Sequence, residues 1–201
     1  MNIDVALKHP HGTAYGSIVV RRDHDRDEKE EKNEEKNEEK NKGWCIHPNI
    51  NDWIFARLRP FYGDSNHLLY NDEDPPDHVG KGTAHAKGVV VWNTNRIGWL
   101  IHSVPGFPSR FPCNPIDEGH LQYGQSFVFL EQPFTDSTLA SILSQLRRMA
   151  VRVYQGELME KESFREELCV VRFSDDVHHV AKSKKWGHDL FEEHRSPRWG
   201  L

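Results

Sequence analysis

The sequence predicts an α+β fold, with some α/β-like character, built from many short strands and at least one well-formed helix. Two apolar runs, residues 89–92 and 99–101, flank a turn that contains Asn and Gly, which is typical of a β-hairpin. Residues 135–150 show the other signal, an apolar stripe at helical spacing. The stripe consists of Leu139, Ile142, Leu143, Leu146 and Met149. Asp136 or Ser137 is expected to cap this helix.

Further short β-rich runs precede and follow the hairpin. The predicted strands outside it cover residues 3–7, 17–20, 68–70, 125–130 and 168–171, with a short extended piece at 151–154. Residues 44–59 are expected to combine a loop with a short helix. Residues 107–123 are rich in Pro, Gly and Asn and predict an irregular loop.

The charge of this 201-residue chain depends strongly on its 13 histidines. With histidine neutral the net charge is −5, so no overall basic character points to nucleic acid. At about pH 5, protonation would move the charge towards roughly +8, because histidine titrates near 6.5. This change suits contact with a polyanion in an acidic compartment, and it is equally compatible with histidines scattered over the surface.

A charged tract occupies residues 23–42 and repeats the unit Glu-Glu-Lys-Asn. It contains no apolar residue, so it cannot contribute to a core, and it predicts a disordered loop between two strands. The three cysteines, Cys45, Cys113 and Cys169, have no metal-site spacing, and their pairing stays open.

The candidate catalytic pair is His85 and Lys87, just before the first strand of the hairpin. Residues two apart share a face if the strand includes both. An imidazole beside an ammonium suits a phosphodiester, because it offers a nucleophile or proton and a positive charge. A metal-dependent nuclease would need clustered carboxylates. The adjacent acidic residues 72–74 diverge in an extended chain, so no metal site is predicted.

Five sequence blocks resemble the deoxyribonuclease II family in their order and approximate spacing. They are LLYND, GTAHAKGVVVW, GWLIHSVPGFP, YGQSFVF and AKSKKWGHDLF, within residues 68–191. The resemblance implies one domain over residues 1–201, with a phospholipase D-like central sheet flanked by helices. It also implies metal-independent hydrolysis of DNA through a phosphohistidine, without a cofactor, in a lysosomal or secreted protein.

The resemblance assigns catalytic roles to His85 and Lys87, although the step that His85 performs stays open. Asn93 falls where the family carries a polar or acidic residue, so it is expected to orient the site. His102 corresponds to a family histidine near the site, where it supports the reaction or packs structurally. The segment beginning at Lys8 also resembles the family, so His9 and the nearby His11 either approach a phosphate or serve the turn.

The family carries a second His-x-Lys motif beyond the last block, whereas this sequence stops at Leu201, shortly after it. His179-Val-Ala-Lys182 has one residue too many to replace the motif. The sequence is therefore expected to represent the first half and middle of a family member. Three hypotheses follow: an acid endonuclease, whose site a homodimer could complete by bringing two His85–Lys87 pairs together, a non-catalytic half-site relative that at most binds DNA, or a gene-model fragment.

Targeting signals are not found in the sequence. The N-terminus lacks the apolar core of a signal peptide, and no run is long enough to span a membrane. The expectation is an incomplete gene model or a protein that stays inside the cell. Residues 178–201 are basic and aromatic, which predicts a surface helix or a strip that grips nucleic acid.

Overall fold

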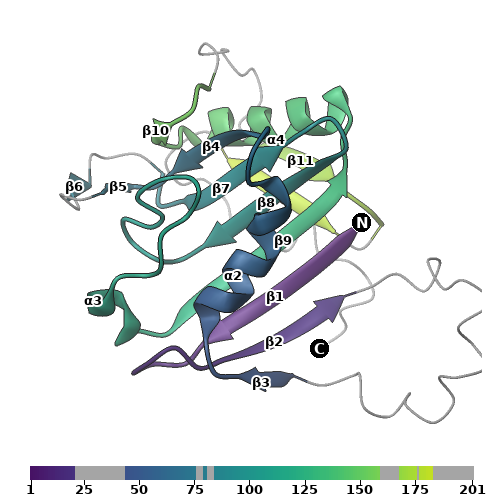
Figure 1. Ribbon diagram of the computed structural model, residues 1–201. Helices are drawn as coiled ribbons and strands as arrows, with labels where there is room; N and C mark the ends of the chain where they lie inside the picture. The colour runs from purple at the N-terminus through teal and green to yellow at the C-terminus, as the bar shows by residue number, and fades with distance from the viewer. Residues whose placement is uncertain (21–43, 76–78, 81–83, 159–167, 176, 183–201) are drawn as a thin grey trace, which may run out of the picture.

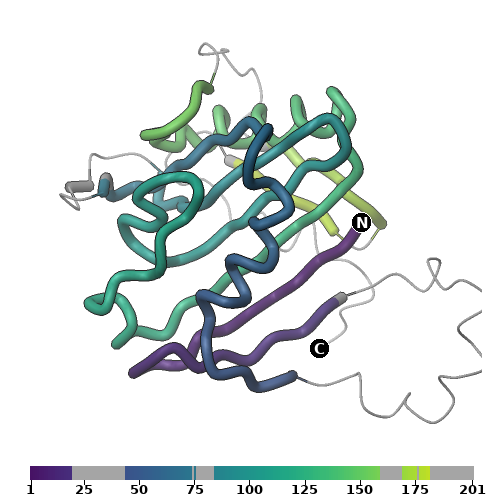
Figure 2. Tube along the Cα trace, viewed as in Figure 1, coloured from purple at the N-terminus to yellow at the C-terminus, as the bar shows by residue number. Residues whose placement is uncertain are grey.

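The computed structural model of the protein describes residues 1–20, 44–75, 79–80, 84–158, 168–175 and 177–182. The charged tract at 23–42 and the tail from 183 onwards lie outside the described residues (Figure 2). The described chain contains one eight-stranded sheet, in the order β10-β4-β7-β8-β9-β1-β2-β3, and every neighbouring pair in it is antiparallel. The sheet and its helices, shown in Figure 1, confirm the predicted α+β class.

The strands of this sheet are β1 (Asn2–Lys8), β2 (Tyr15–Val20), β3 (Cys45–His47), β4 (Asn66–Tyr70), β7 (Lys87–Trp92), β8 (Arg96–His102), β9 (Gln125–Pro133) and β10 (Val153–Gln155). Two small hairpins are formed by β5 (Glu73–Asp74) with β6 (Val79–Gly80), and by β11 (Leu168–Arg172) with β12 (His178–Lys182). The helices are α2 (Ile50–Leu58), η3 (Arg59–Phe61), α3 (Glu118–Leu121) and α4 (Asp136–Met149). The helix expected from residue 178 is wrong for 178–182, which pair with β11 instead.

The sheet has an apolar layer on each face, because alternate residues of a strand point to opposite sides. Val89, Val91 and Leu100 pack in one core with buried residues of α2. Val90 and Trp99 pack in the other core, with buried residues of α4. Figure 1 shows α2 in front of the sheet and α4 behind it. The continuous apolar run of β7 therefore reflects burial on both sides.

Local chemistry sets the ends of both longer helices. Asn49 caps α2 by accepting a hydrogen bond from the backbone N–H of Asn51, at 3.1 Å. Thr135 caps α4 by accepting from the N–H of Thr138, at 3.0 Å. The expected cap at Asp136 or Ser137 is therefore one or two residues too late, since both already belong to the helix. No helix among the described residues is long and apolar enough to cross a membrane.

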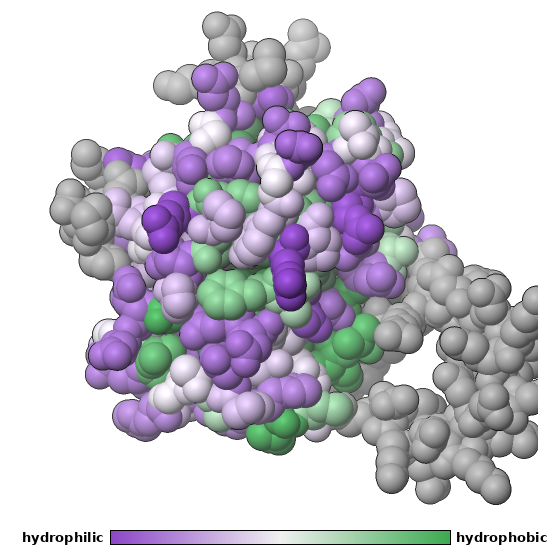
Figure 3. Space-filling model, viewed as in Figure 1, coloured by the Kyte–Doolittle hydropathy of each residue, from purple (hydrophilic) through white to green (hydrophobic). Residues whose placement is uncertain are grey.

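The predicted hairpin is confirmed, with Val90 paired to Trp99 across β7 and β8. Asn93 closes its turn, because its side-chain oxygen accepts from the backbone N–H groups of Asn95 and Arg96, at 2.9 and 3.0 Å. On the face shown in Figure 3, polar side chains surround scattered apolar ones.

Candidate active site

Asp72 is the residue that brings His85 and Lys87 together. Its Oδ2 lies 2.6 Å from His85 Nδ1, and its Oδ1 pairs with Lys87 Nζ. The condition for a shared strand face is not met, because β7 begins at Lys87 and His85 precedes it. Just before the strand the chain turns, and the N–H of Ala86 bonds the carbonyl of Ala84 at 2.8 Å. The bridging carboxylate, rather than strand alternation, therefore joins the imidazole to the ammonium.

The three side chains differ sharply in exposure. The side chain of His85 is 88% exposed, whereas those of Lys87 and Asp72 are 3% and 14% exposed. A buried ammonium is costly without a paired anion, and Asp72 provides that anion. The cluster therefore consists of a largely buried ion pair between Lys87 and Asp72 and the imidazole of His85, which faces solvent.

Asp72 is positioned by the end of β4 and by its buried neighbour Asn71. Strand β4 lies beside β7, with Tyr70 paired to Gly88. The Asn71 amide donates to the carbonyls of Val104 and Phe107, at 3.2 and 3.1 Å. The β5–β6 hairpin then reverses the chain between Asp72 and His85. Asp72 was not predicted as a site residue from the sequence, although it closes the LLYND block and directly follows a predicted strand.

His102 lies directly opposite Lys87 in the β7–β8 register and is buried. Its Nδ1 accepts a hydrogen bond from the N–H of Val104 at 3.2 Å, so the proton of the neutral ring is on Nε2. Burial lowers the pKa of His102 to about 3, and the charge of Lys87 adds to this effect. The structure thus places His102 beside the cluster as a packed, neutral histidine.

Asn93 lies at the opposite end of β7, six residues from Lys87 or about 20 Å along a strand. Its side chain bonds within the hairpin turn. The structure therefore brings together His85, Lys87 and His102, and it does not bring Asn93 to them.

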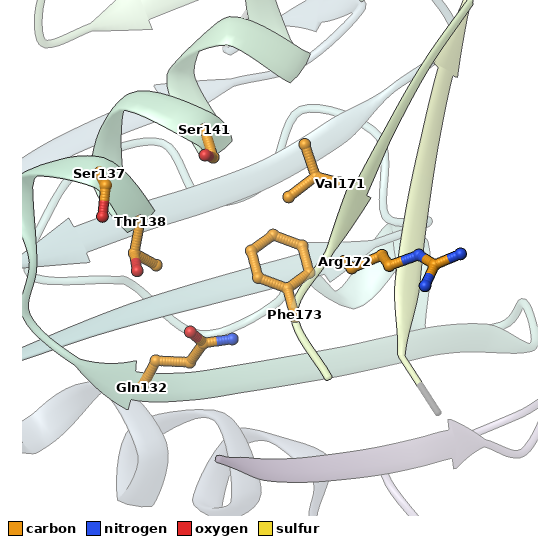
Figure 4. A pocket seen from close by; sticks show the side chains of 7 residues that line it. All are labelled: Gln132, Ser137, Thr138, Ser141, Val171, Arg172 and Phe173. Atoms are coloured by element: carbon orange, nitrogen blue, oxygen red, sulfur yellow. The ribbon is translucent and has the colours of Figure 1, made fainter. Parts of the chain in front are cut away.

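A separate cleft of about 260 Å³ lies at the Asn93 end of the sheet. Gln132, which lines it, pairs with Ile97 just after the hairpin turn. Figure 4 shows that its other walls come from the start of α4 and from residues 171–173. Neither this cleft nor any other part of the described chain groups three or more His, Cys, Asp or Glu side chains that could hold a metal ion.

Comparison with known proteins decides the family. The deoxyribonuclease II family model matches residues 38–199, well over half of the chain. The chain belongs to the deoxyribonuclease II family.

Three relatives illustrate the similarity. Cell death-related nuclease 6 of Caenorhabditis elegans is 28% identical over 191 residues, covering 78% of this chain and 48% of that protein. Deoxyribonuclease-2-beta of Mus musculus is 48% identical over 149 residues, covering 64% and 41%. Deoxyribonuclease-2-alpha of Bos taurus is 32% identical over 124 residues, covering 55% and 33%. The deoxyribonuclease II chain described here thus spans less than half the length of each relative.

The burial of His102 allows us to predict how the free energy of unfolding of this deoxyribonuclease II chain depends on pH. Since the pKa of His102 falls from 6.5 to about 3 on folding, the unfolded chain binds more protons between these values. The free energy of unfolding should therefore fall as pH drops below 6.5, by roughly 2 kcal/mol at pH 5 from His102 alone. His179, whose pKa burial lowers to about 4, acts in the same direction.

Urea unfolding at pH 7 and pH 5 measures this loss directly. In His102→Gln, whose side-chain oxygen can still accept the Val104 N–H, the loss should shrink by about 2 kcal/mol. An unchanged pH dependence in this variant would show that His102 does not cause the loss of stability at low pH.

Proposed function

We propose that this chain carries one catalytic half of an acid endonuclease, which hydrolyses DNA phosphodiesters without a metal ion through a phosphohistidine. The observation that carries the proposal is the 2.6 Å contact between Asp72 Oδ2 and His85 Nδ1. Because the carboxylate engages Nδ1, it fixes the ring so that Nε2 is available to react, as the carboxylate of a catalytic triad does. The 88% exposure of His85 leaves that nitrogen open to a long polymer.

The proposed reaction has two steps. His85 Nε2 attacks phosphorus, and the bond from phosphorus to the leaving oxygen breaks as that oxygen takes a proton from an acid. Water then attacks the phosphohistidine and gives a proton to the conjugate base of that acid, the P–N bond breaks, and both His85 and the acid are restored. Asp72 stabilises the positive charge that develops on the ring, while Lys87 holds Asp72 and contributes positive charge beneath the phosphate.

The acid for the leaving oxygen has to come from a second group. His102 is a poor source, because the ring is buried and its lowered pKa keeps it neutral at about pH 5. Within the 201 residues, His85-Ala86-Lys87 is the single His-x-Lys sequence. We propose that a second copy related by a two-fold axis supplies the group, with two His85 rings facing one phosphate. This arrangement would imitate a phospholipase D-like pairing of two halves.

The competing proposal is an inactive half-site that at most binds DNA. Nicking of supercoiled plasmid at about pH 5 with excess chelator separates the two. If two copies form the site, cleavage should persist with chelator, and the activity per chain should fall on dilution. Absence of cleavage by folded protein at every concentration would support the inactive half-site.

An acid pH optimum would fit a lysosomal or secreted location. Microscopy of the tagged protein in cells would test that location.

A further inference from the structure

We propose that Gln125 binds a DNA phosphate close to the one that is cleaved, by donating hydrogen bonds from its side-chain Nε2. This inference rests on the proposed function, because it adds a second substrate contact along the same edge of the sheet. Gln125 is the first residue of β9 and is only 8% exposed. Its Nε2 has no hydrogen-bond partner among the described residues, and it reaches the surface rather than being sealed in the core. A side chain that is more than nine-tenths buried therefore presents unused donors to solvent.

Ser103 fixes the direction in which the Gln125 amide faces. The Oγ of Ser103 accepts a hydrogen bond from the backbone N–H of Ser126, at 3.0 Å, and the N–H of Ser103 bonds the carbonyl of Ser126, at 3.1 Å. The hydroxyl of Ser103 donates its own proton to Oε1 of Gln125. Because the amide oxygen is held there, Nε2 faces the other way and both of its protons are available to an acceptor.

The segment that holds Gln125 is also bonded to the candidate active site. Val104 follows Ser103, and its carbonyl accepts a hydrogen bond from the side-chain amide of Asn71, at 3.2 Å. Asn71 directly precedes Asp72, the carboxylate of the catalytic cluster. The position of the Gln125 amide is therefore set by the same backbone that positions the cluster.

Gln125 lies close enough to the cluster for one DNA strand to reach both. Phe127 of β9 pairs with His102 of β8, which pairs with Lys87 of β7, so two strand spacings of about 4.8 Å separate β9 from β7. Figure 1 shows the start of β9 on the side of the sheet where α3 lies. A single DNA strand carries a phosphate about every 3.4 Å of its axis. A strand whose phosphate lies at His85 therefore passes Gln125 within about three nucleotides.

A buried positive charge beside Gln125 favours an anion at this place. Lys8 is directly opposite Gln125 in the β1–β9 register, so their Cβ atoms are about 5 Å apart on one face. The buried ammonium of Lys8 donates to the carbonyls of His9, Gly12 and Leu121, at 2.7, 2.8 and 2.7 Å, and these bonds use all its donors. Within the described part of the chain no carboxylate pairs with it. Since buried charges are weakly screened, Lys8 attracts a phosphate towards the Gln125 donors.

Fluorescence anisotropy with a labelled DNA duplex at about pH 5 tests the contact, in a chain that also carries His85→Ala so that the DNA stays intact. Adding Gln125→Met removes the amide and keeps the length of the side chain. Binding should weaken about two- to tenfold, as expected for the loss of a neutral hydrogen bond. The slope of log affinity against log salt should stay the same, because a neutral donor releases no counterions. The loss should be equal for duplexes of different sequence, since phosphates carry no sequence information.

Two further variants make the result specific. Gln125→Glu keeps an oxygen that accepts from Ser103 but replaces the donors with a negative charge. It should bind DNA more weakly than Gln125→Met, and the difference should shrink as salt screens the repulsion. The matched control is Gln132→Met, a half-buried glutamine near the other end of β9, which should leave the affinity unchanged.

Unchanged affinity in both Gln125 variants, in chains of equal melting temperature, would overturn the contact, and so would the absence of DNA binding by the His85→Ala chain. A loss confined to particular sequences would show that Gln125 contacts a base and would reject the phosphate assignment. Because binding is measured apart from cleavage, the two proposals fail separately. Gln125-dependent binding without plasmid nicking by the unsubstituted chain would support the contact and reject the enzyme, whereas nicking with Gln125-independent binding would reject the contact alone.

Discussion

Replacing His85 with alanine should abolish chelator-resistant plasmid nicking at about pH 5, with a loss of at least a hundredfold, the lower range for a lost proton-transfer group. A lost nucleophile should cost considerably more. The fold should be unaffected, because the ring is 88% exposed and no core packing depends on it. The loss of activity is measured as the conversion of supercoiled to nicked plasmid. Gel electrophoresis monitors this conversion at each concentration of a protein dilution series. Circular dichroism confirms that the variant is folded.

Two comparisons sharpen this test. His178→Ala removes an exposed histidine elsewhere and should retain full activity. Asp72→Asn keeps a side-chain oxygen near His85 Nδ1 but removes the charge, so nicking should fall by a smaller factor than in His85→Ala. It should also lower the melting temperature, because the buried ammonium of Lys87 loses its anion. Full nicking activity in His85→Ala would exclude a phosphohistidine at this residue.

Replacing Gly88 with alanine should destabilise the fold by about 3 kcal/mol or more, a large value for one added methyl group. A Cβ at Gly88 would lie 2.6 Å from the Tyr70 ring and 2.5 Å from the backbone oxygen of Leu100. Neither can move freely, because the Tyr70 hydroxyl accepts a hydrogen bond from the Trp99 indole at 3.0 Å and Leu100 belongs to β8. The melting temperature should fall by roughly 10 °C.

Gly119→Ala is the matched control, because nothing lies within 4 Å of a Cβ at that position in α3. Its melting temperature should stay the same or rise slightly, since alanine favours helix. Differential scanning calorimetry of both variants makes the comparison. Similar melting temperatures for Gly88→Ala and the unsubstituted chain would mean that β4 and β7 are packed less tightly than the structure describes.

Much of the secondary structure could be predicted because its signals are local. The hairpin of β7 and β8 follows from two apolar runs and one turn, and α4 follows from a stripe at helical spacing. The order of the strands could not be predicted from such signals. The insertion of β1 between β9 and β2 depends on pairings between distant segments, such as Lys8 with Gln125.

The site was only partly predictable for the same reason. His85 and Lys87 are close in sequence, so their motif was visible, whereas Asp72 reaches them through the pairing of β4 with β7. Asn93 is also close to the motif in sequence, but an extended strand carries it away. Proximity along the chain therefore shows which of these residues are close in sequence, but not which of them share a site, because an extended strand moves residues apart by about 3.3 Å each.

The position of β1 has a consequence for how the protein is made. This strand leaves the ribosome before β9, and the carbonyl of Leu121 that helps to bind Lys8 lies 113 residues later. At synthesis rates of about 5–20 residues per second, roughly 6–23 s pass before that partner exists. During this interval Lys8 stays hydrated and one edge of β1 is unpaired, which invites association with other nascent chains. The pairing of β1 with the rest of the sheet therefore waits for β9, and codon choice or chaperone binding before that point should control the yield of folded protein.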